Sequence, residues 1–193
     1  VTGLVGSEMC IRDRNKGKAV YVEKPLALDM QSITDIEESI YRSENPKLFI
    51  GFNRRFSKSA QFIKQKLINS PANSINLRFS VPPLDSDHWT NIKEIGGGRI
   101  VGEAVHGIDL ACYLFDSLPQ SISASAPVDK TNNMVKDNQV FLNINFANGS
   151  HASLQYFSEA NQILSKERIE VHGDGNSYIL EDFKMLRFLE GSQ

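Results

Sequence analysis

The stretch VFLNINFANGSHASLQYF, residues 140–157, decides the fold class of most of this chain. Apolar and polar residues alternate on both sides of Asn148-Gly149, and this dipeptide between two alternating runs is a strong signal for a β-hairpin. We therefore expect strands over 140–146 and 152–157. Each strand has one apolar face, which must be covered by a second layer of structure.

The same period of two recurs before and after this hairpin. It predicts a strand over 75–81, and GDGN at 173–176 predicts a second hairpin between strands at 168–172 and 178–180. About six strands, mostly antiparallel, indicate an open sheet with helices on one face. The remaining strands of this α+β part are expected at 122–126 and 185–189, and its helices at 59–69 and from about 102 to 115.

An α/β pattern precedes this sheet. A short apolar strand at 19–22 is followed by a helix from Met30 to about Ser43, with Asp29 as its N-cap, and by a buried-strand pattern at 47–52. This order predicts a βαβ unit with parallel strands and a right-handed crossover. One such unit is expected to be the trailing edge of a doubly wound domain.

The chain is therefore expected to divide into an α/β remnant at 15–56 and an α+β domain at 57–193. Residues 1–14 do not have the charged and apolar regions of a signal peptide, and we interpret them as a non-native tail. They are left out of the fold prediction.

Composition and charge indicate an ordinary globular protein. The net charge of −2 gives no reason to expect nucleic acid or an anionic membrane as a partner. No apolar run approaches the roughly 20 residues of a membrane span. Cys10 and Cys112 have neither metal-ligand spacing nor the pattern of a disulfide framework, which favours a reducing cytoplasm.

The segment GGGRIVGEAVHGID, residues 96–109, contains the densest set of reactive side chains. Glu103, His106 and Asp109 would share one face of a helix, and a histidine flanked by carboxylates is suited to proton transfer with a hydroxyl. Taken alone, His106 could equally be a structural histidine satisfied by these carboxylates. The Glu-x-x-His spacing also occurs in di-metal bundles, but no second copy is present, so no metal site is expected.

A second cluster, Glu23-Lys24-Pro25, lies at the end of the first predicted strand. Ligands bind outside the carboxyl ends of strands in open α/β sheets, and a lysine there can donate to a substrate hydroxyl. The alternative is a surface Glu-Lys pair beside a strand-ending proline. The G-x-G-x-x-G loop that binds dinucleotides between a strand and a helix is absent from the sequence.

Three motifs, in this order, resemble those of the glucose–fructose oxidoreductase, inositol dehydrogenase and MocA (Gfo/Idh/MocA) family of NAD(P)-dependent oxidoreductases. The resemblance extends from about Lys16 to the C-terminus, and it identifies the α/β part as the end of a Rossmann domain. It implies hydride transfer between NAD or NADP and a hydroxyl carbon of a sugar or cyclitol-like substrate. The motifs are YVEKPLAL at 21–28, FIGFNRRF at 49–56 and GGGRIVGEAVHGIDL at 96–110.

The resemblance also assigns roles to residues. Lys24 matches the catalytic lysine and His106 the general base, while Glu23 and Pro25 would line the nicotinamide side together with Lys24. Many members have an aspartate four residues before the histidine, where this chain has Gly102. We hypothesise that Glu103 assists from the neighbouring position. The expected substrate contacts are Arg54, Trp89, Arg99 and Asp109.

The segments at 82–103 and 166–183 resemble a branch linked to surface-polysaccharide synthesis. The protein is expected to form homo-oligomers, dimers or tetramers, with the chain as given inactive alone because the nucleotide-binding loop is missing. The alternative function is a non-catalytic module in which the apolar face of the sheet, over 140–157, mediates oligomerisation.

Overall fold

The hairpin that the sequence predicts forms the middle of the main sheet. In this computed structural model, β7 (Val140–Phe146) pairs antiparallel with β8 (His151–Phe157), and Gly149 takes a positive φ of 85° in the turn between them. The structure describes residues 18–43, 47–69, 71, 73–85, 88–129, 134–135 and 138–191. The tail expected at 1–14 lies outside these residues.

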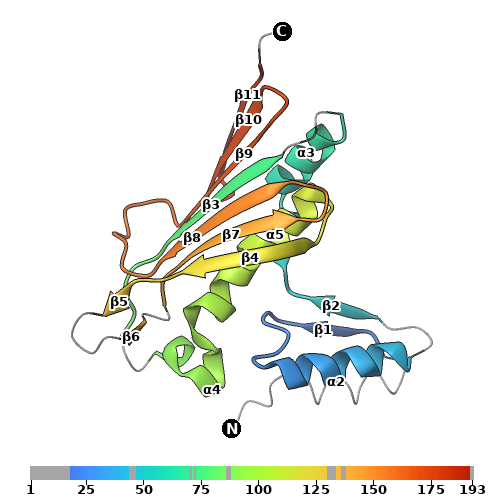
Figure 1. The fold of residues 1–193 in the computed structure, drawn as a ribbon, viewed down its shortest axis with the longest axis vertical. Helices are drawn as coiled ribbons and strands as arrows, with labels where there is room; N and C mark the ends of the chain where they lie inside the picture. Colours follow the sequence, from blue (N-terminus) through green and yellow to red (C-terminus); the bar gives the residue numbers. More distant parts are fainter. Residues whose placement is uncertain are drawn as a thin grey trace.

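The main sheet has seven strands in the order β11-β10-β9-β3-β8-β7-β4 (Figure 1). Every neighbouring pair is antiparallel except β3–β8, which is parallel. The expectation of an open, mostly antiparallel sheet is confirmed. The other five strands are β3 (Ser74–Ser80), β4 (Pro119–Ser125), β9 (Glu167–Gly173), β10 (Asn176–Glu181) and β11 (Met185–Leu189).

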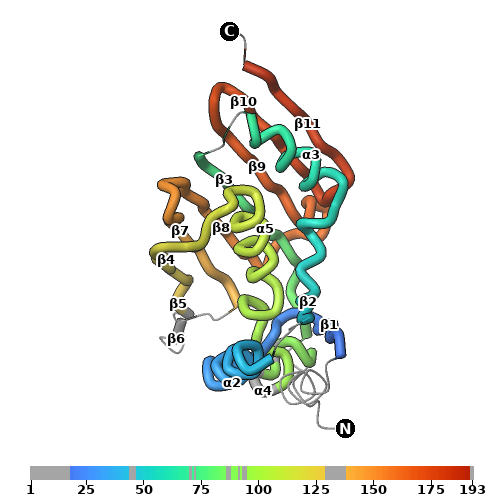
Figure 2. The backbone as a smooth tube through the Cα atoms, turned by 90° about the vertical axis from the view of Figure 1, so that its right-hand side faces the viewer, coloured from blue at the N-terminus to red at the C-terminus, as the bar shows by residue number. Residues whose placement is uncertain are grey.

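Two helices cover one face of this sheet. α3 (Lys58–Leu67) and α5 (Val105–Phe115) lie side by side along it (Figure 2) and share one buried apolar cluster with the inward residues of β3, β7, β8, β9 and β10. The contact is closest at Gly107, where an added Cβ would lie 2.6 Å from Leu154 Cδ1 and 2.8 Å from Phe79 Cε2. The sheet therefore fixes the position of α5.

The opposite face of the sheet is mainly polar. On β7, Asn143 and Asn145 are exposed, while Leu142 and Ile144 are buried under the helices. The apolar face over 140–157, which the alternative function assigns to oligomerisation, is covered by α3 and α5 in this structure. Oligomerisation through this sheet stays a prediction.

The N-terminal part is a small parallel unit, as expected. β1 (Val20–Val22) pairs parallel with β2 (Leu48–Ile50), and α2 (Met30–Tyr41) connects them. The Asp29 side chain caps α2 by accepting a hydrogen bond from the Ser32 N–H at 2.8 Å. A short turn, η1 (Asn53–Phe56), then leads to α3, so the domain boundary expected after Phe56 falls between these two elements and stays a prediction.

The segment before α5 differs from the expectation. Residues 89–96 contain two short helices that no sequence signal indicated, η2 (Trp89–Asn91) and α4 (Lys93–Gly96). The helix expected from about residue 102 starts as a π-helical turn, η3 (Ile100–Ala104). π-Helical turns are rare and are frequent at functional sites. This turn changes which side chains share a face with His106.

A separate pair of short strands, β5 (Val128–Asp129) and β6 (Met134–Val135), lies beyond β4. Among the helices of the described residues, none has both the length and the apolar character needed to cross a bilayer.

Candidate active site

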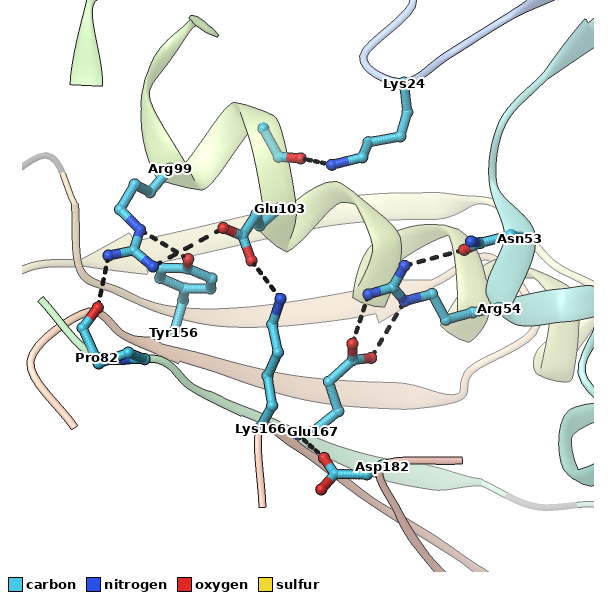
Figure 3. Close-up of polar contacts among 11 residues, drawn as sticks. Lys24, Asn53, Arg54, Pro82, Arg99, Glu103, Tyr156, Lys166, Glu167 and Asp182 are labelled. Atoms are coloured by element: carbon cyan, nitrogen blue, oxygen red, sulfur yellow. Dashed lines mark hydrogen bonds and ion pairs between the residues drawn. The ribbon is translucent and has the colours of Figure 1, made fainter. Parts of the chain in front are cut away.

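The two sequence clusters meet where the parallel unit contacts the start of α5. Lys24 follows β1 directly, and its Nζ donates a hydrogen bond to the backbone oxygen of Gly102 in the π-helical turn (Figure 3). Partial burial lowers the pKa of Lys24, and the charge of Glu103 opposes this shift. Residues separated by almost eighty positions in the sequence thus form one site.

His106 lies in the first turn of α5 and is only 4% exposed. Its ring contacts Phe52 edge-on, with centroids 6.1 Å apart, and its Nδ1 has no hydrogen-bond partner among the described residues. Burial first, and then the positive charges of Arg54, Lys24 and Lys166, lower its pKa to about 3. The imidazole is therefore neutral at pH 7, and its Nδ1 is a buried ring nitrogen without a partner in the described residues.

The expected flanking of His106 by two carboxylates does not occur in the described part of the chain. The Glu103 carboxylate lies 3.1 Å from Lys166 Nζ and 3.8 Å from Arg99 Nη2. Asp109 is held by Arg55 in a two-point ion pair, with Arg55 Nε donating to Asp109 Oδ2 at 3.0 Å. The π-helical turn separates Glu103 from the α-helical face that carries His106.

Arg99 is buried and lies inside the protein, beside the site. Its Nε donates to the Tyr156 hydroxyl at 3.1 Å and its Nη1 to the Pro82 carbonyl at 3.0 Å. Burial and the nearby Glu103 raise the pKa of Tyr156 well above its usual value, so its hydroxyl stays protonated. Arg99 thus contacts Glu103 from the protein interior. A direct contact between Arg99 and the substrate stays a prediction.

Arg54 approaches from the opposite side. Its Nε donates to Glu167 Oε2 at 3.2 Å and its Nη2 to Oε1, and the Glu167 backbone N–H donates to Asp182. This fork-shaped pairing is the geometry in which arginine binds carboxylates best. Arg54 is therefore fixed by β9, and its charge still lowers the pKa of His106.

Three other expected site residues lie in different surroundings. Glu23 is exposed and accepts a hydrogen bond from the Tyr21 hydroxyl at 3.1 Å, and Pro25 follows a cis peptide bond. Trp89 is 58% exposed and stacks on His88, with ring centroids 6.0 Å apart. Within the described residues, neither Glu23 nor Trp89 contacts His106.

Sequence reasoning did not find four residues of this network: Phe52, Tyr156, Lys166 and Glu167. Because β3 and β8 are parallel and β9 is antiparallel to β3, the carboxyl ends of β3 and β8 and the beginning of β9 meet at one edge of the sheet. Polar residues near these strand ends could have indicated a site. The pairing of β9 with β3, which brings the strand ends together, cannot be predicted from periodicity.

No group of histidine, cysteine, aspartate or glutamate side chains suited to a metal ion occurs among the described residues. A cavity of about 410 Å³ opens at the far end of α5 from His106. It is lined by Lys64, Leu67, Ile68, Pro71, Leu114, Phe115, Asp116 and Asn148, and it contains none of the predicted site residues.

Several solved structures that share this fold are named as oxidoreductases or dehydrogenases. Levoglucosan dehydrogenase in complex with NADH and levoglucosan aligns with a TM-score of 0.82 at 22% identity, covering 100% of this chain and 56% of that chain. An NAD binding oxidoreductase from Klebsiella pneumoniae aligns with a TM-score of 0.83 at 20% identity, covering 98% and 55%. At these identities the likeness shows the fold.

A family model shows the family of this chain, and a curated relative is similar in sequence. Inositol 2-dehydrogenase of Rhizobium meliloti (strain 1021) is 26% identical over 185 residues, which cover 91% of this chain and 54% of the relative. This chain thus spans about half the length of that curated relative. The family model for the GFO/IDH/MocA C-terminal domain matches residues 71–179, more than half of the chain. The chain therefore belongs to the Gfo/Idh/MocA family.

Proposed function

We propose that this chain carries the proton-transfer part of the active site of an NAD(P)-dependent oxidoreductase acting on a hydroxyl group of a sugar or cyclitol. The observation that carries the proposal is the meeting of Lys24 and His106 at the junction of the two units. The names of the relatives, which include inositol and levoglucosan dehydrogenases, support this substrate class.

The residues present fit the nicotinamide end of a dinucleotide. β1 and β2 are parallel, so their carboxyl ends form the edge at which such folds bind ligands, and Lys24 lies there with a half-buried ammonium. When bound, the nicotinamide would exchange a hydride with the substrate carbon, and Glu23, Lys24 and Pro25 would line its site. Nothing in the sequence matches the glycine loop for the pyrophosphate.

His106 would take the hydroxyl proton of the substrate, or return it in the reverse direction. Its ring is neutral at pH 7 and so can accept a proton, while the positive charges of Arg54, Lys24 and Lys166 weaken it as a base until the bound substrate changes the local charge. An ammonium has three N–H donors, and Lys24 uses one of them on the carbonyl of Gly102. Another of its N–H groups can donate to the substrate hydroxyl that His106 deprotonates, which favours the ionisation of that hydroxyl.

Glu103 would assist through Lys24. Its negative charge raises the pKa of Lys24, whereas no carboxylate contacts His106 in the described residues. The aspartate usual in the family is missing at Gly102, where an added Cβ would meet only the Gly96 oxygen, at 3.6 Å, and would not clash. With Gly102 in place of that aspartate, Glu103 is the carboxylate next to this position.

The pH dependence of kcat/KM for the full-length protein tests this role. Glu103→Gln removes the charge that raises the pKa of Lys24, so the basic limb of the profile should move to lower pH. Glu181→Gln, which removes a carboxylate paired with Arg168 away from the site, should leave the profile unchanged. An unchanged profile in Glu103→Gln would refute the assistance by Glu103.

The reaction itself is tested by incubating the full-length protein with NAD⁺ or NADP⁺ and a panel of sugars, cyclitols and nucleotide sugars. Reduced cofactor should form with at least one substrate, and the assay then also gives the cofactor preference and any link to polysaccharide precursors. Residues 18–191 alone should not bind NADH in a fluorescence titration, because the pyrophosphate loop is missing. A lack of turnover with the whole panel, together with no cofactor binding by the full-length protein, would refute the proposed function.

A further inference from the structure

The charges around the site do not balance. Glu103 is the one carboxylate shared by two cations, Arg99 at 3.8 Å and Lys166 at 3.1 Å. Arg99 is buried and cannot find another counter-ion in solvent, so its charge needs Glu103. Lys166 is therefore the cation whose charge is in excess at this carboxylate.

The other cations do not remove the excess. Arg54 and Glu167 neutralise each other in their two-point pair, and Lys24 donates its hydrogen bond to a backbone carbonyl rather than to a carboxylate. The described site thus has four cationic side chains, and the carboxylates that contact them are those of Glu103 and Glu167. The exposed Glu23 acts on Lys24 only as a nearby charge, and the Asp182 carboxylate accepts from the Glu167 backbone N–H. Figure 3 shows Lys24, Arg54 and Lys166 reaching from three separate segments toward the start of α5.

Lys166 is the cation best placed to meet a substrate. Its side chain is 51% exposed, whereas its backbone is fixed, because its carbonyl accepts the Ser80 N–H at 2.8 Å and the next residue begins β9. The ammonium can therefore move from Glu103 to a ligand without any change in the sheet, and Glu103 would keep Arg99 as its partner.

We propose that the substrate is an anionic sugar or cyclitol derivative, with a carboxylate or phosphate group that Lys166 binds. This inference rests on the proposed function and names the substrate class of the same site. Bound anionic charge would also offset the positive charges that now lower the pKa of His106, which would make the ring a better base.

The test compares glucuronate, glucose 6-phosphate and glucose with the full-length protein. Two readouts are used: binding of each compound by calorimetry without cofactor, and kcat/KM with NAD⁺ and NADP⁺. The wild-type protein should bind at least one of the two anions more tightly than glucose, and the comparison between them distinguishes carboxylate from phosphate recognition.

Lys166→Met should weaken binding of the preferred anion about 10- to 100-fold and raise its KM, because a charged hydrogen bond in the ground state is lost. Lys166→Arg should restore most of the binding. Lys184→Met is the matched control, since Lys184 is an exposed lysine in the β10–β11 turn, and it should behave as wild type.

Equal binding of glucose and both anions, or an equal loss for all three in Lys166→Met, would overturn the inference. Selective anion binding without turnover of any compound would instead keep the inference and count against the dehydrogenase function, so the two proposals fail separately.

Discussion

The parallel unit and the seven-stranded sheet differ sharply in how they are packed. In the unit, β1 and β2 have three residues each, and the paired side chains of Tyr21 and Phe49 are 64% and 61% exposed. In the sheet, inward residues of the strands and of α3 and α5 form one continuous buried cluster. Among the described buried hydrophobic residues, only Ala27 and Ile36 lie outside that cluster.

This difference matters because the site takes residues from both regions. His106 belongs to the well-packed region, where the contact at Gly107 fixes α5, whereas Lys24 comes from the sparsely packed unit. The links that join the regions include the Lys24 hydrogen bond to Gly102, the ion pairs of Arg55 with Asp109 and of Arg54 with Glu167, and the ring contact of Phe52 with His106. The chemistry therefore depends on a junction that is weaker than the core beside it.

The largest expected effect is on catalysis, at the well-packed side of the junction. His106→Asn removes the proton-transfer group and should lower kcat of the full-length protein about 10²- to 10⁴-fold. The unfolding midpoint in urea should change little, because the ring has no hydrogen-bond partner on Nδ1 to lose among the described residues. A variant with near-normal kcat would show that His106 is a structural residue.

The next effect concerns the ion pair that joins the two regions. Arg55→Met leaves the largely buried Asp109 carboxylate without its partner and should destabilise the chain by about 2–3 kcal/mol in urea unfolding. In the double variant with Asp109→Asn, part of this loss should be recovered, because no buried charge remains unpaired. Strictly additive effects of the two substitutions would show that the pair does not couple the regions.

The pH dependence of stability should show the contribution of His106. Its pKa is about 3 in the folded chain and about 6.5 when unfolded, so the unfolded state binds the proton first as pH falls. Above pH 6.5 the group is neutral in both states and does not lower the free energy of unfolding. As pH falls toward 3, protonation of the unfolded state lowers this free energy, by at most about 2 kcal/mol between pH 6.5 and 5. Urea unfolding across this window should show a smaller decline in His106→Asn, and identical slopes would contradict the lowered pKa.

The smallest expected effects compare one helix cap in each region. Asp29→Ala and Ser57→Ala each remove a side-chain acceptor for a backbone N–H, worth about 1 kcal/mol. If the regions unfold separately, Ser57→Ala should lower the stability of the sheet, whereas Asp29→Ala should reduce only the hydrogen-exchange protection of α2. An equal fall in global stability for both would show that the regions unfold as one unit.

Much of the architecture was predictable because it depends on local periodicity. Both hairpins, the final strand at 185–189 and the Asp29 cap were found where the sequence indicated them. The short helices between 89 and 96 were missed, since they are too short to show a period.

The sequence by itself determined the long helices and the strands of the main sheet, the order of the two regions and the candidate roles of Lys24 and His106. Only the tertiary structure decided the partners of the charged residues: Asp109 with Arg55, Glu103 with Lys166 and Arg99, and Arg54 with Glu167. The reason is physical. Periodicity depends on neighbours along the chain, whereas ion pairs depend on strand order and on a π-helical turn, which bring together residues up to 113 positions apart.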